Sequence, residues 1–171
     1  RDALKKLIGL TLVLFSLGFG FAQPNASSYY AGGLLGIGFP GAAGLSVTTF
    51  GLTGYFGASD LLTDNLDVRG GLSFGFGSVA GVSASFFRLA ADAIYNIELG
   101  PDVPITPHAG GGLRFGRLAG GGEGAGGFGV GFLAGARYPF SAQLSGVAEL
   151  SFDVYFGQIT VTHPALAVGI R

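Results

Sequence analysis

Residues 66–77, LDVRGGLSFGFG, alternate between two kinds of side chain, and this alternation constrains the fold more than any other feature of the chain. Leu72 and Phe74 fall on one parity, whereas Asp67 and Arg69 fall on the other. A period of two is typical of a β-strand with two unlike faces. In a soluble sheet the apolar face packs on a core, but in a barrel that crosses a membrane the apolar face meets lipid and the polar face lines the interior.

The same alternation recurs in short segments that Gly and Pro separate. Strands are predicted at 29–39, 45–56, 66–76, 82–97, 105–116, 128–138, 143–155 and 159–171. Most have the ~9–11 residues that a tilted strand needs to cross a bilayer. Eight antiparallel strands joined by short turns predict an all-β fold, a closed up-and-down transmembrane β-barrel, because closure removes the sheet edges.

The distribution of glycine indicates which face of the predicted strands points into the barrel. The chain has 34 Gly and 16 Phe, and only 11% of its residues are charged, against about 25% in an ordinary soluble domain. The polar faces of the strands are mostly Gly with a few charged residues, although Gly in a strand costs roughly 0.5–1 kcal/mol relative to Ala. The narrow interior of an eight-stranded barrel supplies a steric reason for these glycines. We therefore expect the charged face to point inward and the apolar face to contact lipid.

Charges inside such a barrel need partners, because an unpaired buried charge is costly. Strand positions place Arg88, Arg114 and Asp153 toward the outer mouth, and Asp92 and Glu149 near the middle. The residues predicted to form an interior ion-pair network are Asp67, Arg69, Arg88, Asp92, Arg114, Arg137, Glu149 and Asp153. Strand positions place Asp67, Arg69, His108 and Arg137, and provisionally Arg171, toward the periplasmic end. Structural filling of the lumen is favoured over a gated polar path.

Tyrosines mark one membrane interface. The predicted aromatic girdle at the periplasmic level consists of Tyr29, Tyr30, Tyr55, Tyr95 and Tyr138, as is usual at the rims of membrane barrels. The opposite ends of the strands carry phenylalanines. Two phase slips are expected, at the FF of 86–87 and the HP of 163–164, with a bulge at Pro164 because proline cannot donate to the ladder.

The N-terminus predicts export. Residues 1–22 are a predicted signal peptide, with basic Lys5 and Lys6, an apolar run and the small-residue sequence GFA before Gln23. A membrane anchor is the alternative, but the apolar stretch is shorter than the ~20 residues of a spanning helix. Residues 23–28 are a predicted linker and 29–171 the barrel.

At this point the chain resembles the small eight-stranded outer-membrane barrels, the OmpA/OmpX-like superfamily. The resemblance rests on YYAGGLLGIGF, FRLAADAIYNI, ITPHAGGGLRFG and LAVGIR. It implies insertion into a bacterial outer membrane, with outer-membrane lipid, barrel-insertion machinery and periplasmic chaperones as partners. It specifies the fold better than the function.

Other kinds of site are weakly supported. GIGFPG matches the spacing of a dinucleotide-binding loop, but Pro40 and the following strand exclude the helix that this loop requires. The two histidines lack metal-ligand spacing, so no metal and no cofactor are expected. Ser151, Asp153 and His163 are the only candidates for a lipid-modifying triad, and their parity directs Ser151 and Asp153 into the lumen, away from lipid. A net charge of −1 gives no basic footprint for nucleic acid.

The predicted outer loops, near 40–44, 77–81, 117–127 and 155–158, are short, and the one at 117–127 is a flexible glycine-rich loop. Short loops disfavour an adhesin-like surface. The sequence therefore predicts a non-enzymatic outer-membrane barrel with a structural, envelope-integrity role and a plugged polar lumen. A narrow channel for small or apolar solutes and a surface-recognition barrel are the alternatives.

Overall fold

The computed structural model describes residues 29–171, except for 43–44, 61–62, 80–81, 121–122 and 158–159. The predicted signal peptide (1–22) and linker (23–28) lie outside the described residues. The strands are β1 (Tyr29–Gly38), β2 (Gly41–Ala42), β3 (Leu45–Ser46), β4 (Thr49–Ala58), β5 (Leu66–Val79), β6 (Val82–Asn96), β7 (Thr106–Gly120), β8 (Glu123–Pro139), β9 (Ser145–Phe156) and β10 (Val161–Ile170).

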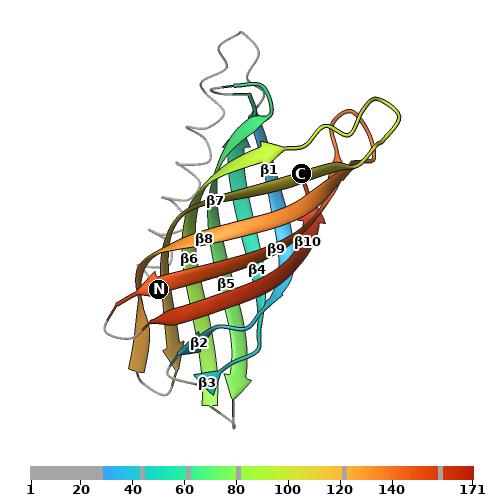
Figure 1. Ribbon diagram of the computed structural model, residues 1–171. Helices are drawn as coiled ribbons and strands as arrows, with labels where there is room; N and C mark the ends of the chain where they lie inside the picture. Colours follow the sequence, from blue (N-terminus) through green and yellow to red (C-terminus); the bar gives the residue numbers. More distant parts are fainter. Residues whose placement is uncertain (1–28, 43–44, 61–62, 80–81, 121–122, 158–159) are drawn as a thin grey trace, which may run out of the picture.

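The strands form one closed antiparallel barrel (Figure 1). Its wall consists of β1 and β4 to β10, each at least ten residues long. Each wall strand pairs with the next along the chain, and β1 pairs with β10 from Gly33↔Ile170 to Gly38↔Ala165, which closes the barrel. The described part of the chain contains no helix long and apolar enough to cross a bilayer. The predicted eight-stranded up-and-down barrel is confirmed.

The two ends of the barrel differ. At the upper end in Figure 1, called here the terminal end, β1 begins and β10 finishes. At the opposite end, called the hairpin end, the β5–β6 ladder continues to Val79↔Val82 and the β7–β8 ladder to Gly120↔Glu123. The predicted loops at 77–81 and 117–127 therefore extend too far into the strands, and most of the second is paired strand. The ladders thus pair backbone groups as far as these two residue pairs.

Pro40, which follows β1, and Pro164, which lies in β10, leave the register of the neighbouring strands unchanged. β2 and β3 continue the ladders of β1 and β4, so Gly41 and Ala42 of the predicted loop at 40–44 are strand, and 43–44 lie outside the described residues. The carbonyl of Pro40 accepts a hydrogen bond from the Val47 amide at 2.9 Å, and the carbonyl of Pro164 accepts one from the Phe39 amide at 2.8 Å. The bulge predicted at Pro164 is wrong: β10 pairs with β9 without an inserted residue. Each proline leaves out only the bond that its own nitrogen cannot donate.

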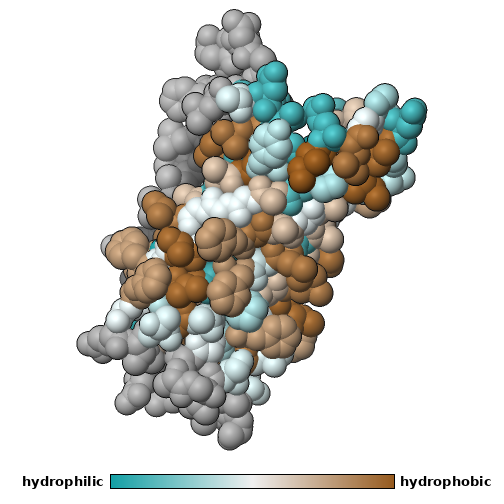
Figure 2. All heavy atoms as spheres, viewed as in Figure 1, coloured by the Kyte–Doolittle hydropathy of each residue, from teal (hydrophilic) through white to brown (hydrophobic). Residues whose placement is uncertain are grey.

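The outer face of the wall is apolar along its length. Phe132 and Leu150 are 66% and 61% exposed on this face. Figure 2 shows hydrophobic residues spread over the strands, with hydrophilic residues gathered at the terminal end. An exposed apolar surface this extensive is stable only against lipid. The prediction that the charged side of residues 66–77 points inward is confirmed, since Asp67 and Arg69 are both buried.

The phase slip expected at residues 86–87 is absent. The register of β6 with β5 and β7 is continuous through both phenylalanines. Phe86 is 3% exposed inside the barrel, whereas Phe87 faces outward and packs against Phe74 with ring centroids 5.4 Å apart. The sequence suggested a change in the alternation at Phe86–Phe87 because Phe86 is an apolar side chain on the inward face.

The barrel interior as the candidate functional site

Asp153 on β9 is the centre of the interior near the hairpin end. It is fully buried, and it accepts hydrogen bonds from Arg114 Nε at 2.7 Å, Arg88 Nη1 at 2.9 Å and Tyr155 Oη at 3.2 Å. His163 on β10 lies opposite Asp153 in the ladder, with 3.7 Å between Nδ1 and Oδ2. Two guanidinium groups and a hydroxyl thus compensate the burial of one carboxylate.

Arg114 and Arg69 extend this arrangement toward the terminal end. Arg114 Nη1 lies 2.6 Å from Asp92 Oδ1, and Arg69 Nη2 lies 3.6 Å from Asp92 Oδ2. Arg69 also donates from both Nη atoms to the two oxygens of Glu149, at 2.7 and 3.1 Å. His108 Nε2 approaches Glu149 Oε1 at 3.1 Å.

These contacts form one continuous series across the lumen. We call it the interior ion-pair chain; its members, in order, are Arg88, Asp153, Arg114, Asp92, Arg69, Glu149 and His108. Each acid in the chain contacts a guanidinium on either side or a guanidinium and an imidazole. Buried polar groups of this kind are tolerated only when their partners are present.

Apolar clusters pack inside the lumen toward each end of the ion-pair chain. At the hairpin end Phe86, Tyr155 and Val161 pack together, supported by Leu118 and Ala125. At the terminal end the cluster consists of Leu34, Tyr55 and Val147, with Tyr30 and Ala167 against it. We call these the hairpin-end plug and the terminal-end plug. The centre of the ion-pair chain therefore lies between two apolar clusters.

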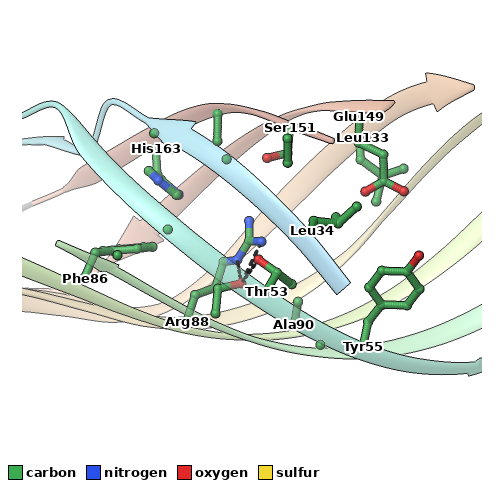
Figure 3. Close-up of a pocket in the computed structure, with 18 of the residues that line it drawn as sticks. Leu34, Thr53, Tyr55, Phe86, Arg88, Ala90, Leu133, Glu149, Ser151 and His163 are labelled. Atoms are coloured by element: carbon green, nitrogen blue, oxygen red, sulfur yellow. Dashed lines mark hydrogen bonds between the residues drawn. The ribbon is translucent and has the colours of Figure 1, made fainter. Parts of the chain in front are cut away.

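Little free space remains in the lumen. One cavity of about 70 Å³ lies along β1, β4 and β5, and a second of about 10 Å³ lies nearer the terminal end. Tyr55, Arg69 and Glu149 line both cavities and so form the partition between them. Figure 3 shows the larger cavity, with Phe86 and His163 toward one end and Tyr55 and Glu149 toward the other. These volumes suit a few waters and one water respectively.

Glycine makes room for the ion pairs. A Cβ at Gly135 would lie 2.9 Å from both Glu149 Cγ and His108 Nε2, and one at Gly131 would collide with the Arg114–Asp153 pair. Both glycines face inward on β8. Their position agrees with the steric reason given for glycine on the polar faces.

The terminal mouth contains a separate ion pair. Asp67 accepts hydrogen bonds from Arg171 Nη1 at 2.8 Å and from Asn96 Nδ2 at 3.0 Å. The Arg171 guanidinium lies over the Tyr30 ring, 3.4 Å from its centroid. Arg137 on β8 makes no ion pair within the described residues. The structure thus joins six of the eight residues proposed for the network into one chain, and leaves Asp67 and Arg137 outside it.

The structure corrects the girdle. Tyr29, Tyr95 and Tyr138 are exposed on the outer face, but Tyr30 and Tyr55 point into the lumen. Tyr55 is 5% exposed and donates from Oη to the Ile170 carbonyl at 3.0 Å. The five tyrosines share a level along the barrel but not a parity, and parity decides the face.

Several residues that contact the interior ion-pair chain were not among the predicted network residues. Tyr155 follows Asp153 by two residues, so strand periodicity alone places both on one face. Ser73 shares the parity of Asp67 and Arg69, but its hydrogen bond from Arg88, with 2.9 Å between Nη2 and the Ser73 hydroxyl, depends on the register of β5 with β6. Ser151 lines the larger cavity together with His163, which keeps both from the lipid face. The described residues contain no group of three or more His, Cys, Asp or Glu arranged to hold a metal.

A closed barrel with a lipid-facing apolar wall and a charged interior defines the class: the chain has the fold of the small eight-stranded outer-membrane β-barrels. Neisserial surface protein A is similar in structure, with a TM-score of 0.73 and 16% identity over 85% of this chain and 97% of that one. OprG of Pseudomonas aeruginosa matches with a TM-score of 0.54 and 12% identity, over 84% of this chain and 93% of that one.

The outer-membrane enzyme PagL also shares the fold, with a TM-score of 0.52 and 14% identity over 80% of this chain and 97% of that one. The fold therefore accommodates more than one kind of function. No protein-family model matches the sequence, and no curated protein matches it significantly.

Proposed function

We propose that the protein is a sealed, non-enzymatic barrel of the bacterial outer membrane with a structural role in the envelope. Under this proposal the terminal end faces the periplasm, the outer wall is in contact with outer-membrane lipid, and insertion machinery and periplasmic chaperones are its partners during biogenesis. The observation that carries the proposal is the interior ion-pair chain, which crosses the lumen between two apolar plugs.

A permeant ion would have to break this chain. Arg114 contacts Asp153 and Asp92 together, so its displacement uncouples two buried carboxylates at once. Removing one partner of a buried pair costs about 3–5 kcal/mol. Apolar plugs on both sides add a desolvation barrier for any ion. Rapid passage of ions is therefore opposed at three successive levels.

An enzymatic role finds little support in the geometry. Ser151 and His163 line a cavity inside the wall rather than a groove open to lipid. A lipid substrate would need access to that cavity, which has a volume of about 70 Å³, whereas pockets for small-molecule ligands typically have about 300–1,000 Å³.

Ion efflux from vesicles tests the sealed lumen. Purified protein is reconstituted into potassium-loaded vesicles, and efflux is compared for wild type, Arg88→Ala and Arg117→Ala. Arg117 lies on β7 near the hairpin end and is exposed on the outer face, so it is the matched control. We expect wild type and Arg117→Ala to remain tight and Arg88→Ala to leak. Rapid efflux through the wild type would support the narrow-channel alternative instead.

A further inference from the structure

The charges inside the barrel do not balance. Its interior arginines are Arg69, Arg88, Arg114, Arg137 and Arg171, and its interior acids are Asp67, Asp92, Glu149 and Asp153. Each of the four acids lies within 4 Å of at least one arginine nitrogen. Arg137 is the one interior arginine that has no acid within 4 Å among the described residues.

The acids nearest to Arg137 already have partners. Both oxygens of Glu149 accept from Arg69, and Oε1 is also 3.1 Å from His108 Nε2. Asp67 is held by Arg171 and by the Asn96 amide. Neither acid can turn to Arg137 without losing a short contact. The guanidinium therefore has unused donors in a partly buried position.

The position of Arg137 is suited to a ligand that enters from the terminal end. It sits between Thr106 and Val147 in the ladder and lines the 10 Å³ cavity together with Tyr30 and Arg171. Three guanidinium groups, those of Arg69, Arg137 and Arg171, thus line this small space, together with the Glu149 carboxylate that Arg69 and His108 already engage. Guanidinium groups prefer carboxylate and phosphate oxygens, which accept their parallel N–H bonds.

The rim leaves one uncharged approach to this space. Exposed acids occupy the other terminal turns: Asp60 and Asp64 lie between β4 and β5, and Glu98 and Asp102 lie between β6 and β7. The turn between β8 and β9, residues 140–144, has no charged residue and adjoins Arg137. An anion is repelled least on this side.

The 10 Å³ cavity has room for one water, so an anion bound by Arg137 would lie at its opening. From this geometry we infer that the terminal mouth is a binding site for a small oxyanion, a phosphate or carboxylate group, held by Arg137 with help from Arg171. The phosphate can be free or part of a phospholipid headgroup. The inference is independent of whether the barrel conducts ions.

Arginine side-chain NMR provides the test. Protein labelled with ¹⁵N-arginine is refolded in zwitterionic micelles and titrated with inorganic phosphate at constant ionic strength. We expect a saturable shift of the Arg137 Nε–H signal and a smaller one for Arg171, with Arg117 unaffected. Chloride at the same ionic strength is the control for screening. A shift that never saturates, or that chloride reproduces, overturns the inference.

Two variants make the result specific. Arg137→Gln removes the charge but breaks no ion pair seen in the structure, so the remaining arginine signals should persist and report an intact fold. We expect about tenfold or greater weakening of phosphate binding, as for the loss of a charge-assisted hydrogen bond. Arg117→Gln should bind like the wild type. Equal affinity of Arg137→Gln and wild type contradicts the site. If Arg137→Gln does not fold, Arg137→Met, which also removes the charge, takes its place with the same criterion.

Nanodiscs distinguish the two sources of phosphate. The Arg137 signal is compared, without free phosphate, in phosphatidylcholine discs and in discs that also contain phosphatidylglycerol. A shift only with phosphatidylglycerol identifies the lipid headgroup, and a shift only with added phosphate identifies a soluble anion. No shift under either condition rejects the inference.

Discussion

Arg114 and Asp153, on β7 and β9, are joined by a 2.7 Å contact in a region where neither side chain is more than 1% exposed. The strand between them, β8, contributes Gly131 at this level, and a Cβ there would meet both groups. The pair therefore depends on a glycine in the intervening strand. This relationship connects the sequence bias toward glycine with the closure of the lumen.

Arg114→Ala should be strongly destabilising. It leaves Asp153 with fewer donors and removes the nearest guanidinium from Asp92, and breaking a buried pair costs about 3–5 kcal/mol. Denaturant-induced unfolding in lipid vesicles measures the change. Arg117→Ala, on the outer face of the same strand, should change the free energy of unfolding by less than about 0.5 kcal/mol. Equal effects of the two variants would refute the structural role of the chain.

Gly131→Ala should destabilise the barrel by about 1–3 kcal/mol through overpacking. Gly131→Phe should have a larger effect, because a ring cannot fit beside the Arg114–Asp153 pair. Gly54→Ala is the matched control: Gly54 faces outward on β4, with no atom within 4 Å of the added Cβ. If both Ala variants have the same stability, crowding of the lumen does not explain the inward glycines.

Leu150→Arg should reduce stability in lipid by about 2–4 kcal/mol, the usual penalty for arginine on the lipid face near the bilayer midplane. The position is 61% exposed on the outer wall, immediately after the interior Glu149. A complementary check uses Leu72→Cys and Leu150→Cys in intact membranes. Ready reaction of either thiol with a polar, membrane-impermeant reagent contradicts the assignment of the faces.

A single tryptophan can report the corrected girdle, since the native chain contains none. Tyr95→Trp should be quenched by brominated lipids, because Tyr95 is exposed on the outer face. Tyr55→Trp should be protected, since Tyr55 is buried within the terminal-end plug. Fluorescence quenching in matched vesicles measures the difference. Strong quenching at position 55 would restore Tyr55 to the girdle.

The sequence was sufficient to predict the closed barrel and the direction of its charged faces, because side-chain parity within a strand is a local property. It was not sufficient for the pairing of Arg69, which was placed nearer the periplasmic end than Asp92 and Glu149. The structure sets Arg69 directly opposite Asp92 in the β5–β6 ladder. Register depends on the offset between strands, which the pattern of one strand does not encode.

Two other errors have related causes. Tyr30 and Tyr55 were grouped with the girdle by height, although their parity directs them inward. Phe86 was taken as a phase slip because an apolar residue was not expected inside, yet it forms part of the hairpin-end plug. Where apolar side chains fill the lumen, as at Phe86, the sequence no longer alternates between apolar outward and polar inward residues.

Single-channel recording of the unmutated protein in planar bilayers tests the sealed lumen most directly. The interior ion-pair chain and the two plugs predict no steady conductance above that of the protein-free bilayer, at either polarity of the applied voltage. Correct insertion is verified on the same preparation by protease protection. A large, stable conductance from folded, inserted wild-type protein would contradict the sealed barrel and identify the lumen as a channel.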